Sequence, residues 1–143
     1  MRKIYIANDH AGYELKFELL KYLQDLGYVV ENLGTDCIDS VDYPDFADKL
    51  AEVIGDDLGI LICGSGIGIS IAANRHSNIR AALCDSETYA RLAREHNDAN
   101  VICFGGRLLG VDMAKSILDV FLNTDFSNGA RHIKRIDKLC KKI

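Results

Sequence analysis

Short apolar runs alternate with amphipathic segments along the whole chain. Five of these runs have the length of a β-strand, and they lie at Lys3–Ala7, Tyr28–Leu33, Leu58–Cys63, Ile79–Cys84 and Val101–Phe104. Between the first two, leucines such as Leu15, Leu19 and Leu23 recur at helical spacing, and Gly27 ends this predicted helix. Further helices are predicted at Asp45–Ile54, Ile69–Arg75, Glu87–Glu95, Val111–Leu122 and Arg131–Lys142.

The alternation of strands and helices with short connections predicts parallel strands joined by right-handed crossovers. We therefore expect a single α/β domain over residues 1–143, a three-layer α/β/α sandwich around a five-stranded parallel, Rossmann-like sheet. The C-terminal helix of this sandwich carries Arg131 and Arg135. Only the connection from Gly34 to Tyr43 is long, and such a loop in a compact domain is more often functional than idle.

Polar segments follow four of the predicted strands, at the ends where parallel sheets bind their ligands. They are Asn8–Gly12, Cys63–Gly68, Asp85–Ser86 and Gly105–Arg107. We expect all four to face one crevice, which makes their side chains the first candidates for a functional site.

Composition and charge exclude several classes of function. The net charge of −4 argues against nucleic acid as a general partner. No apolar stretch is long enough to cross a membrane, and a strand is expected directly after the first residues, so we expect neither a membrane segment nor a signal peptide. The five cysteines form no Cys-x-x-Cys pair and the four histidines lack metal-ligand spacing. We therefore expect no disulfide, metal or cofactor, and a reducing compartment, the cytoplasm.

The strongest chemical signal is Cys63, which ends an apolar run and opens directly into a glycine-rich turn. The turn comprises Gly64, Ser65, Gly66, Ile67 and Gly68. Its successive backbone N–H groups, next to a helix N-terminus, attract anions, and the same groups favour the thiolate form of a cysteine at the rim. A base beside an oxyanion cradle is what proton removal next to a carbonyl requires. Cys84 and Cys103 are expected to pack in the core, and Cys37 and Cys140 carry no signal.

Other phosphate-binding motifs fit this turn less well. A P-loop needs a lysine that the turn lacks, while a dinucleotide fingerprint needs glycine, and a phosphatase loop arginine, where Ile69 stands. A nucleotide site stays open as the weaker alternative, because Asp85 follows about 20 residues later, as in dinucleotide sites.

Three further groups have both a functional and an ordinary structural interpretation. Asp9 is interpreted either as a helix cap or as the carboxylate that orients His10 toward a ligand. His96 is interpreted either as the cap of a helix C-terminus or, because it falls on the inward-leaning side of its helix, as an acid or base. Arg131 and Arg135 lie four residues apart on one helix face. They are interpreted either as a phosphate-binding pair or as part of a solvated basic helix, and from spacing alone the solvated helix is favoured.

The whole chain resembles the ribose-5-phosphate isomerase B family of sugar-phosphate isomerases. The resemblance is carried by six segments in order: Asp9–Gly12, Asp42–Pro44, Cys63–Asn74, His96–Asn100, Phe104–Arg107 and Gly129–His132. It implies metal-free interconversion of an aldose phosphate and a ketose phosphate through an enediolate. Ser65 stands where the family usually has threonine, and Ala130 where many relatives have glycine.

The resemblance also implies a role for each site residue. Cys63 matches the proton-abstracting base, the amides of Gly64–Gly68 the enediolate cradle, and Ser65 a proton shuttle to the sugar oxygen. His96, with Asp9 nearby, matches the acid that opens the sugar ring. The sugar and phosphate contacts match His10, Tyr43, Asn97, Arg107, Arg131 and Arg135. In the family the site straddles a homodimer, so His96, Asn97, Arg107 and Tyr43 are expected to face Cys63 of a second chain.

Three functions compete at this point. Isomerisation of ribose 5-phosphate is favoured: the family's galactose enzymes are built from two different subunits, whereas this one chain carries base, turn, histidine and arginines together, which favours a self-sufficient homodimer. The same chemistry on allose or galactose 6-phosphate is the closest alternative. A non-catalytic phosphate-binding module has no need of Cys63 or His96. The preferred sugar, the physiological direction and the pairing of dimers into tetramers stay open.

Overall fold

The computed structural model describes residues 2–141 and contains a five-stranded sheet. The strands are β1 (Ile4–Asn8), β2 (Val30–Asn32), β3 (Leu58–Cys63), β4 (Ala81–Leu83) and β5 (Val101–Gly105). All neighbours pair in parallel, in the order β2-β1-β3-β5-β4. The predicted five-stranded parallel sheet is therefore confirmed.

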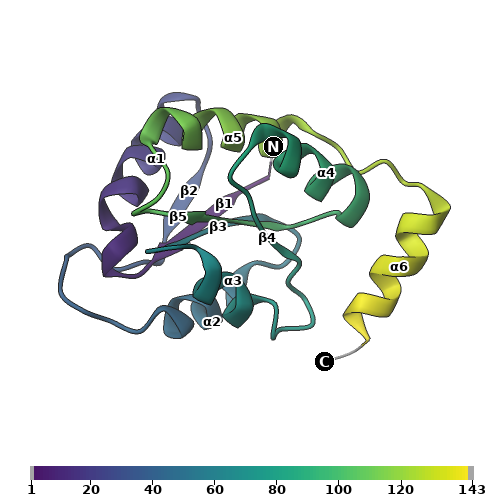
Figure 1. The fold of residues 1–143 in the computed structure, drawn as a ribbon, viewed down its shortest axis with the longest axis horizontal. Helices are drawn as coiled ribbons and strands as arrows, with labels where there is room; N and C mark the ends of the chain where they lie inside the picture. The colour runs from purple at the N-terminus through teal and green to yellow at the C-terminus, as the bar shows by residue number, and fades with distance from the viewer. Residues whose placement is uncertain (1, 142–143) are drawn as a thin grey trace.

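Helices cover both faces of the sheet, as the predicted three-layer sandwich requires. They are η1 (His10–Gly12, a 3-10 turn), α1 (Tyr13–Asp25), α2 (Tyr43–Val53), α3 (Ile67–Ala73), α4 (Glu87–Asn97), α5 (Val111–Asn123) and α6 (Ala130–Cys140). Figure 1 shows α1, α5 and α4 on one face, α2 and α3 on the other, and α6 standing beside the layers. The last helix was expected to reach Lys142, which lies outside the described residues.

The apolar faces of these elements form two clusters, one on each side of the sheet. Every residue of β1, β3 and β5 is buried, because these strands have neighbours on both edges and helices on both faces. On one side Leu19 and Phe121 pack against the sheet, and on the other side Phe46 and Leu50 do so. The site is thus carried by the most rigid strands of the fold.

The two edge strands are shorter than the sequence predicts. Tyr28–Leu33 shrinks to three residues in β2, and Ile79–Cys84 to three in β4. Each edge strand pairs with one neighbour only and remains partly exposed. The hydrogen-bonded ladder is therefore shorter than the apolar run in the sequence. The apolar pattern alone does not distinguish an edge strand from a central one.

The strand order places the ligand-binding position between β1 and β3. From β1 the chain moves to β2 on one side, and it then returns to β3 on the other side of β1. At such a reversal the loops that leave the carboxyl ends diverge and open a crevice. The segments at this point are Asp9, after β1, and the glycine turn, after β3.

Candidate functional site

An open hollow of about 530 Å³ lies at the carboxyl ends of β1, β3 and β5. It is lined by Asp9, Tyr43, Cys63, Gly64, Ser65, Ile67, Gly68, Arg107 and Leu108. Eight of these nine residues were expected in the site from the sequence; Leu108 was not. A thiol, a carboxylate, a phenol, a hydroxyl and a guanidinium therefore share one solvent-accessible space.

The glycine turn is shaped by close contact with β5. Gly66 has a φ of 78°, in the left-handed region, and a Cβ there would lie 2.8 Å from the Phe104 carbonyl carbon. The backbone N–H of Gly106 donates to the Cys63 carbonyl (2.8 Å), and that of Arg107 donates to the Gly64 carbonyl (3.0 Å). These bonds fasten the two turns together and bring the Arg107 guanidinium over the glycine backbone, where it adds positive charge to the cradle.

Substituting Gly66 with alanine should lower the free energy of unfolding by roughly 2–4 kcal/mol, because the new methyl combines an unfavourable φ with overpacking. Denaturant titration measures the change. Gly110→Ala is the matched control, since a Cβ at Gly110 meets no atom within 4 Å, and its effect should stay below about 1 kcal/mol. Equal losses in both variants would contradict the tight packing of the turn.

The Ser65 hydroxyl is hydrogen-bonded to the first residue of α3 and remains able to donate a proton. Its Oγ accepts a hydrogen bond from the Ile67 N–H at 3.2 Å. A hydroxyl that accepts in this way keeps its own O–H directed elsewhere. Ser65 is half-buried at the hollow, so a sugar oxygen bound there is within the reach of this group.

The cysteines separate into two kinds, as expected. Cys63 is only 4% exposed but lines the hollow at the end of β3. Burial, with Asp85 nearby, raises the pKa of Cys84 to about 12, and burial raises the pKa of Cys103 above its ordinary range. Both of these thiols stay neutral and pack in the core, whereas Cys63 alone among the three lines the hollow.

Asp9 has the capping role considered for it, and its side chain also lies in the hollow. Its Oδ1 accepts from the Ala11 N–H at 3.0 Å and so caps η1, while the same side chain lines the hollow. The next residue, His10, uses Nδ1 to accept from the Val41 N–H at 3.2 Å. The histidine is thereby tied to the long loop, with Nε2 left for another partner.

The long loop delivers Tyr43 to the hollow. Tyr43 is the first residue of α2, and a Cβ on Gly68 would lie 2.5 Å from its Cζ, so the phenol packs directly on the glycine turn. Lys16 holds the loop from beneath; it is 1% exposed and donates to the Thr35 carbonyl (2.8 Å) and to the Asp36 carboxylate. Hydrogen bonds from Lys16 and Asn32 lower the pKa of Asp36. Sequence reasoning missed Lys16, because a lysine in an amphipathic helix resembles a surface residue.

A second group of predicted site residues lies around the end of α4. His96 and Asn97 form its last turn, and both are exposed, so the expected inward-leaning position of His96 is wrong. His132 of α6 stacks on His96, with ring centroids 4.4 Å apart. Desolvation, together with the charges of His96, Arg131 and Arg135, lowers the pKa of His132. The stacked imidazoles and the two predicted phosphate-binding arginines thus form one cluster, and the stacking of His132 on His96 was not predicted.

The two groups lie at opposite ends of the sheet within one chain. Asn100, just after the α4 turn, accepts from the N–H of Gly59 at the start of β3. Cys63 lies four residues further along the strand, roughly 13 Å away at the rise of an extended chain. His96 is therefore not near Asp9 of the same chain, because α4 runs antiparallel to the strands and ends at their amino ends.

Two other expectations also differ from the structure. Tyr43 and Arg107 were expected opposite Cys63 of a second chain, but both line the hollow of their own Cys63. Asp85 and Ser86 do not line that hollow; Ser86 instead caps α4 by accepting from the Tyr89 N–H at 3.2 Å. The reason is that β4 is the outer strand, so its loop lies beyond β5 and away from the β1–β3 reversal.

Residues 2–141 contain neither a membrane-spanning helix nor a cluster of metal ligands. None of the helices there is long and apolar enough to cross a membrane. Within the same residues, histidine, cysteine and acidic side chains form no group of three or more able to hold a metal ion.

Comparisons with known proteins agree on one family. The family model described as Ribose/Galactose Isomerase matches residues 4–139. Ribose-5-phosphate isomerase B of Escherichia coli is 42% identical over 142 residues, which cover 97% of this chain and 95% of the relative. A putative sugar phosphate isomerase of Rickettsia conorii is 45% identical over 139 residues, 95% of this chain and 96% of that protein.

Solved structures give the same result. A ribose 5-phosphate isomerase of Thermotoga maritima matches with a TM-score of 0.95 and 50% identity, covering 98% of each chain. Ribose-5-phosphate isomerase B of Clostridium thermocellum matches with a TM-score of 0.94 and 48% identity, covering 97% of this chain and 95% of that one. With the family model, the full-length relatives and these structures in agreement, the chain belongs to the ribose/galactose isomerase family.

Proposed function

We propose that this chain interconverts ribose 5-phosphate and ribulose 5-phosphate through a cis-enediolate. The observation that carries the proposal is the single hollow that holds Cys63, the glycine turn and Arg107. Relatives that match nearly the whole chain are ribose-5-phosphate isomerases, which supports the pentose as the substrate. The cysteines are all unpaired, which fits a reducing compartment, the cytoplasm.

Cys63 serves as the base in this mechanism. Its thiolate removes the proton from C2 of the open-chain aldose, the electron pair forms the C1–C2 double bond, and negative charge develops on the carbonyl oxygen. The amides of Gly64–Gly68 face that charge and stabilise it. The Ser65 hydroxyl moves a proton between the two sugar oxygens, and Cys63 returns its proton to C1 to give the ketose.

The cationic side chains bind the phosphate and the sugar hydroxyls. Arg107 lies over the glycine turn, and His10, which follows Asp9 after β1, uses Nδ1 for the Val41 N–H and leaves Nε2 for the substrate. Arg131 and Arg135 lie one helical turn apart beside the His96–His132 pair, where two guanidinium groups suit several phosphate oxygens. Asn97 and Tyr43 contact the sugar.

A complete site requires two chains, because His96 and Asn97 lie at the other end of β3 from Cys63. Apolar surface beside the hollow supports a homodimer: Ile67 and Ile71, one turn apart on α3, are 53% and 60% exposed. None of the residues of α6 is buried, and Ile133 and Leu139 on that helix are largely exposed. Exposed apolar faces of this kind are typical of protein interfaces. Each site then combines Cys63 of one protomer with His96 of its partner.

Side-by-side turnover of ribose 5-phosphate, allose 6-phosphate and galactose 6-phosphate tests the substrate. We expect kcat/KM to be highest for ribose 5-phosphate. A preference for either hexose phosphate would assign the hexose activity instead. Binding of all three without isomerisation would overturn the enzyme function and leave a phosphate-binding module.

His96 is expected to open the sugar ring. Ribose 5-phosphate is mostly cyclic in water, so its ring oxygen needs a proton before Cys63 can reach C2, and an imidazole is a side chain that can supply one. His96→Asn should lower turnover of the cyclic aldose by roughly a hundredfold. It should spare hydrogen exchange at C1 of ribulose 5-phosphate, which cannot close to a furanose. Equal losses in both assays would leave His96 as a helix cap.

A further inference from the structure

The end of α4 is held by an unusual arrangement of charges immediately after His96 and Asn97. Asp98 is the C-cap, and its φ of 44° lies in the left-handed region that normally favours glycine. An aspartate here is strained, and glycine or asparagine would end the helix at lower cost. Ending the helix therefore does not by itself explain why residue 98 is an aspartate.

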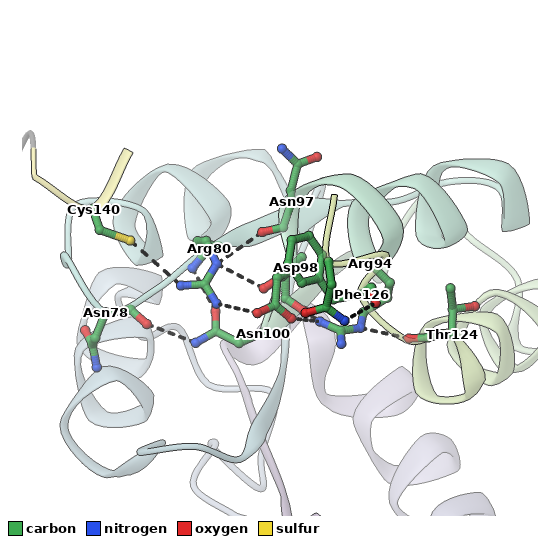
Figure 2. Close-up of polar contacts among 11 residues, drawn as sticks. Asn78, Arg80, Arg94, Asn97, Asp98, Asn100, Thr124, Phe126 and Cys140 are labelled. Atoms are coloured by element: carbon green, nitrogen blue, oxygen red, sulfur yellow. Dashed lines mark hydrogen bonds and ion pairs between the residues drawn. The ribbon is translucent and has the colours of Figure 1, made fainter. Parts of the chain in front are cut away.

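One oxygen of the Asp98 carboxylate is held by Arg94, one turn earlier in α4. The Arg94 side chain is only 6% exposed, and its guanidinium donates to Asp98 Oδ1 (2.9 Å), to the Ala99 carbonyl (2.6 Å) and to the Thr124 carbonyl (3.1 Å). Figure 2 shows Arg94 bonded to Asp98 at the end of α4 and to Thr124 at the end of α5. A buried guanidinium with this many acceptors is fixed in one position.

The other side of the carboxylate faces Arg80, which precedes β4. The Arg80 Nε donates to the carbonyls of Asp98 (2.9 Å) and Asn97 (3.1 Å), and its terminal nitrogen lies 3.5 Å from Asp98 Oδ2. The backbone N–H of Arg80 in turn donates to the Asn100 side chain at 2.7 Å. Figure 2 shows Arg80 between Asn97, Asp98 and Asn100. The last turn of α4 is thus held by Arg80 from before β4 and by Arg94 from within α4.

We infer that Asp98, held between Arg80 and Arg94, is a positioning residue that fixes the direction in which His96 and Asn97 leave α4. Withdrawing charges from water costs much of the free energy that their pairing returns, so the geometry that these contacts fix is the better explanation for them than stability. His96 and Asn97 are exposed, and among residues 2–141 the His132 ring alone stacks on His96, so their placement for a second chain depends on the helix end. This inference rests on the proposed role of His96 in ring opening.

Two substitutions separate the carboxylate from the backbone conformation. Both Asp98→Gly and Asp98→Asn keep the left-handed turn, and only the second keeps a polar side chain. We expect Asp98→Gly to lower turnover of cyclic ribose 5-phosphate about tenfold, and Asp98→Asn by less, because displacement of an acid by a fraction of an ångström weakens proton transfer. Hydrogen exchange at C1 of ribulose 5-phosphate should fall less than about twofold in both variants.

Asp119→Asn is the matched control for loss of a structural carboxylate. Asp119 accepts from the Tyr22 hydroxyl at 2.7 Å, a contact between α5 and α1 away from the α4 end. This variant should change stability without changing the ratio of aldose turnover to ketose exchange. If Asp98→Gly folds poorly, the ratio measured for Asp98→Asn decides the question.

The double variant His96→Asn/Asp98→Gly distinguishes failure of the inference from failure of the proposed function. If Asp98 acts through His96, the double variant turns over the aldose no more slowly than His96→Asn alone. Additive losses, or an unchanged aldose-to-ketose ratio in both Asp98 variants while His96→Asn remains selective, would overturn the positioning role. A His96→Asn variant that is not selective would instead overturn the proposed role of His96 itself.

Discussion

Replacing Cys63 with alanine is expected to lower turnover of ribose 5-phosphate at least about a hundredfold, while KM changes little. Proton removal from carbon needs a base that is already in position, and Cys63 is the thiol that lines the hollow. The methyl of alanine fits the space of the thiol, so the turn should keep its shape. Steady-state kinetics on purified protein measure both constants.

Cys103→Ala provides the matched comparison for this substitution. Cys103 lies on the neighbouring strand β5, it is fully buried, and it is outside the lining of the hollow. Its removal should cost stability, on the order of 1 kcal/mol, and leave kcat close to that of the wild type. Near-normal turnover in Cys63→Ala, or an equal loss in Cys103→Ala, would contradict the assignment of the base.

Mixing two inactive variants should restore activity if the site is shared. A dimer of one Cys63→Ala chain and one His96→Asn chain contains one site in which both residues are intact. Random reassortment of equal amounts makes half of the dimers mixed, so about a quarter of wild-type activity should return. Each variant refolded alone provides the baseline.

Subunit exchange has to be shown in the same samples, with distinguishable tags on the two chains. Isolated mixed dimers should then have about half of the wild-type activity per dimer. Mixed dimers with no activity above the baseline would mean that each chain completes its own site. The roughly 13 Å between the start of β3 and Cys63 is the reason to expect rescue.

Much of the fold follows from local pattern. The strands β1, β3 and β5 are long apolar runs, and the structure places all three in the centre of the sheet. The apolar runs do not show which strands are neighbours. That β5 inserts between β3 and β4, and that β2 and β4 are short edges, depends on packing between distant segments.

The same distinction, between local pattern and packing of distant segments, separates the site residues that were predictable from those that were not. Cys63 and its turn were predictable because strand, thiol and glycines are consecutive, and their chemistry is local. The separation of His96 from Cys63 depends on the direction of α4, and the stack of His96 on His132 joins two helices that are distant in sequence. Lys16 becomes buried only because the loop after β2 folds over it. Local spacing carries no signal for any of these contacts.

Exchange of hydrogen at C1 of ribulose 5-phosphate in D2O tests Cys63 as the base most directly, because it reports proton removal without ring opening. The wild-type protein should replace one C1 hydrogen with deuterium, as followed by NMR. Cys63→Ala should lose this exchange at least about a hundredfold, and His96→Asn should retain it. Isomerisation without uptake of deuterium, or exchange that survives in Cys63→Ala, would contradict the enediolate mechanism with Cys63 as its base.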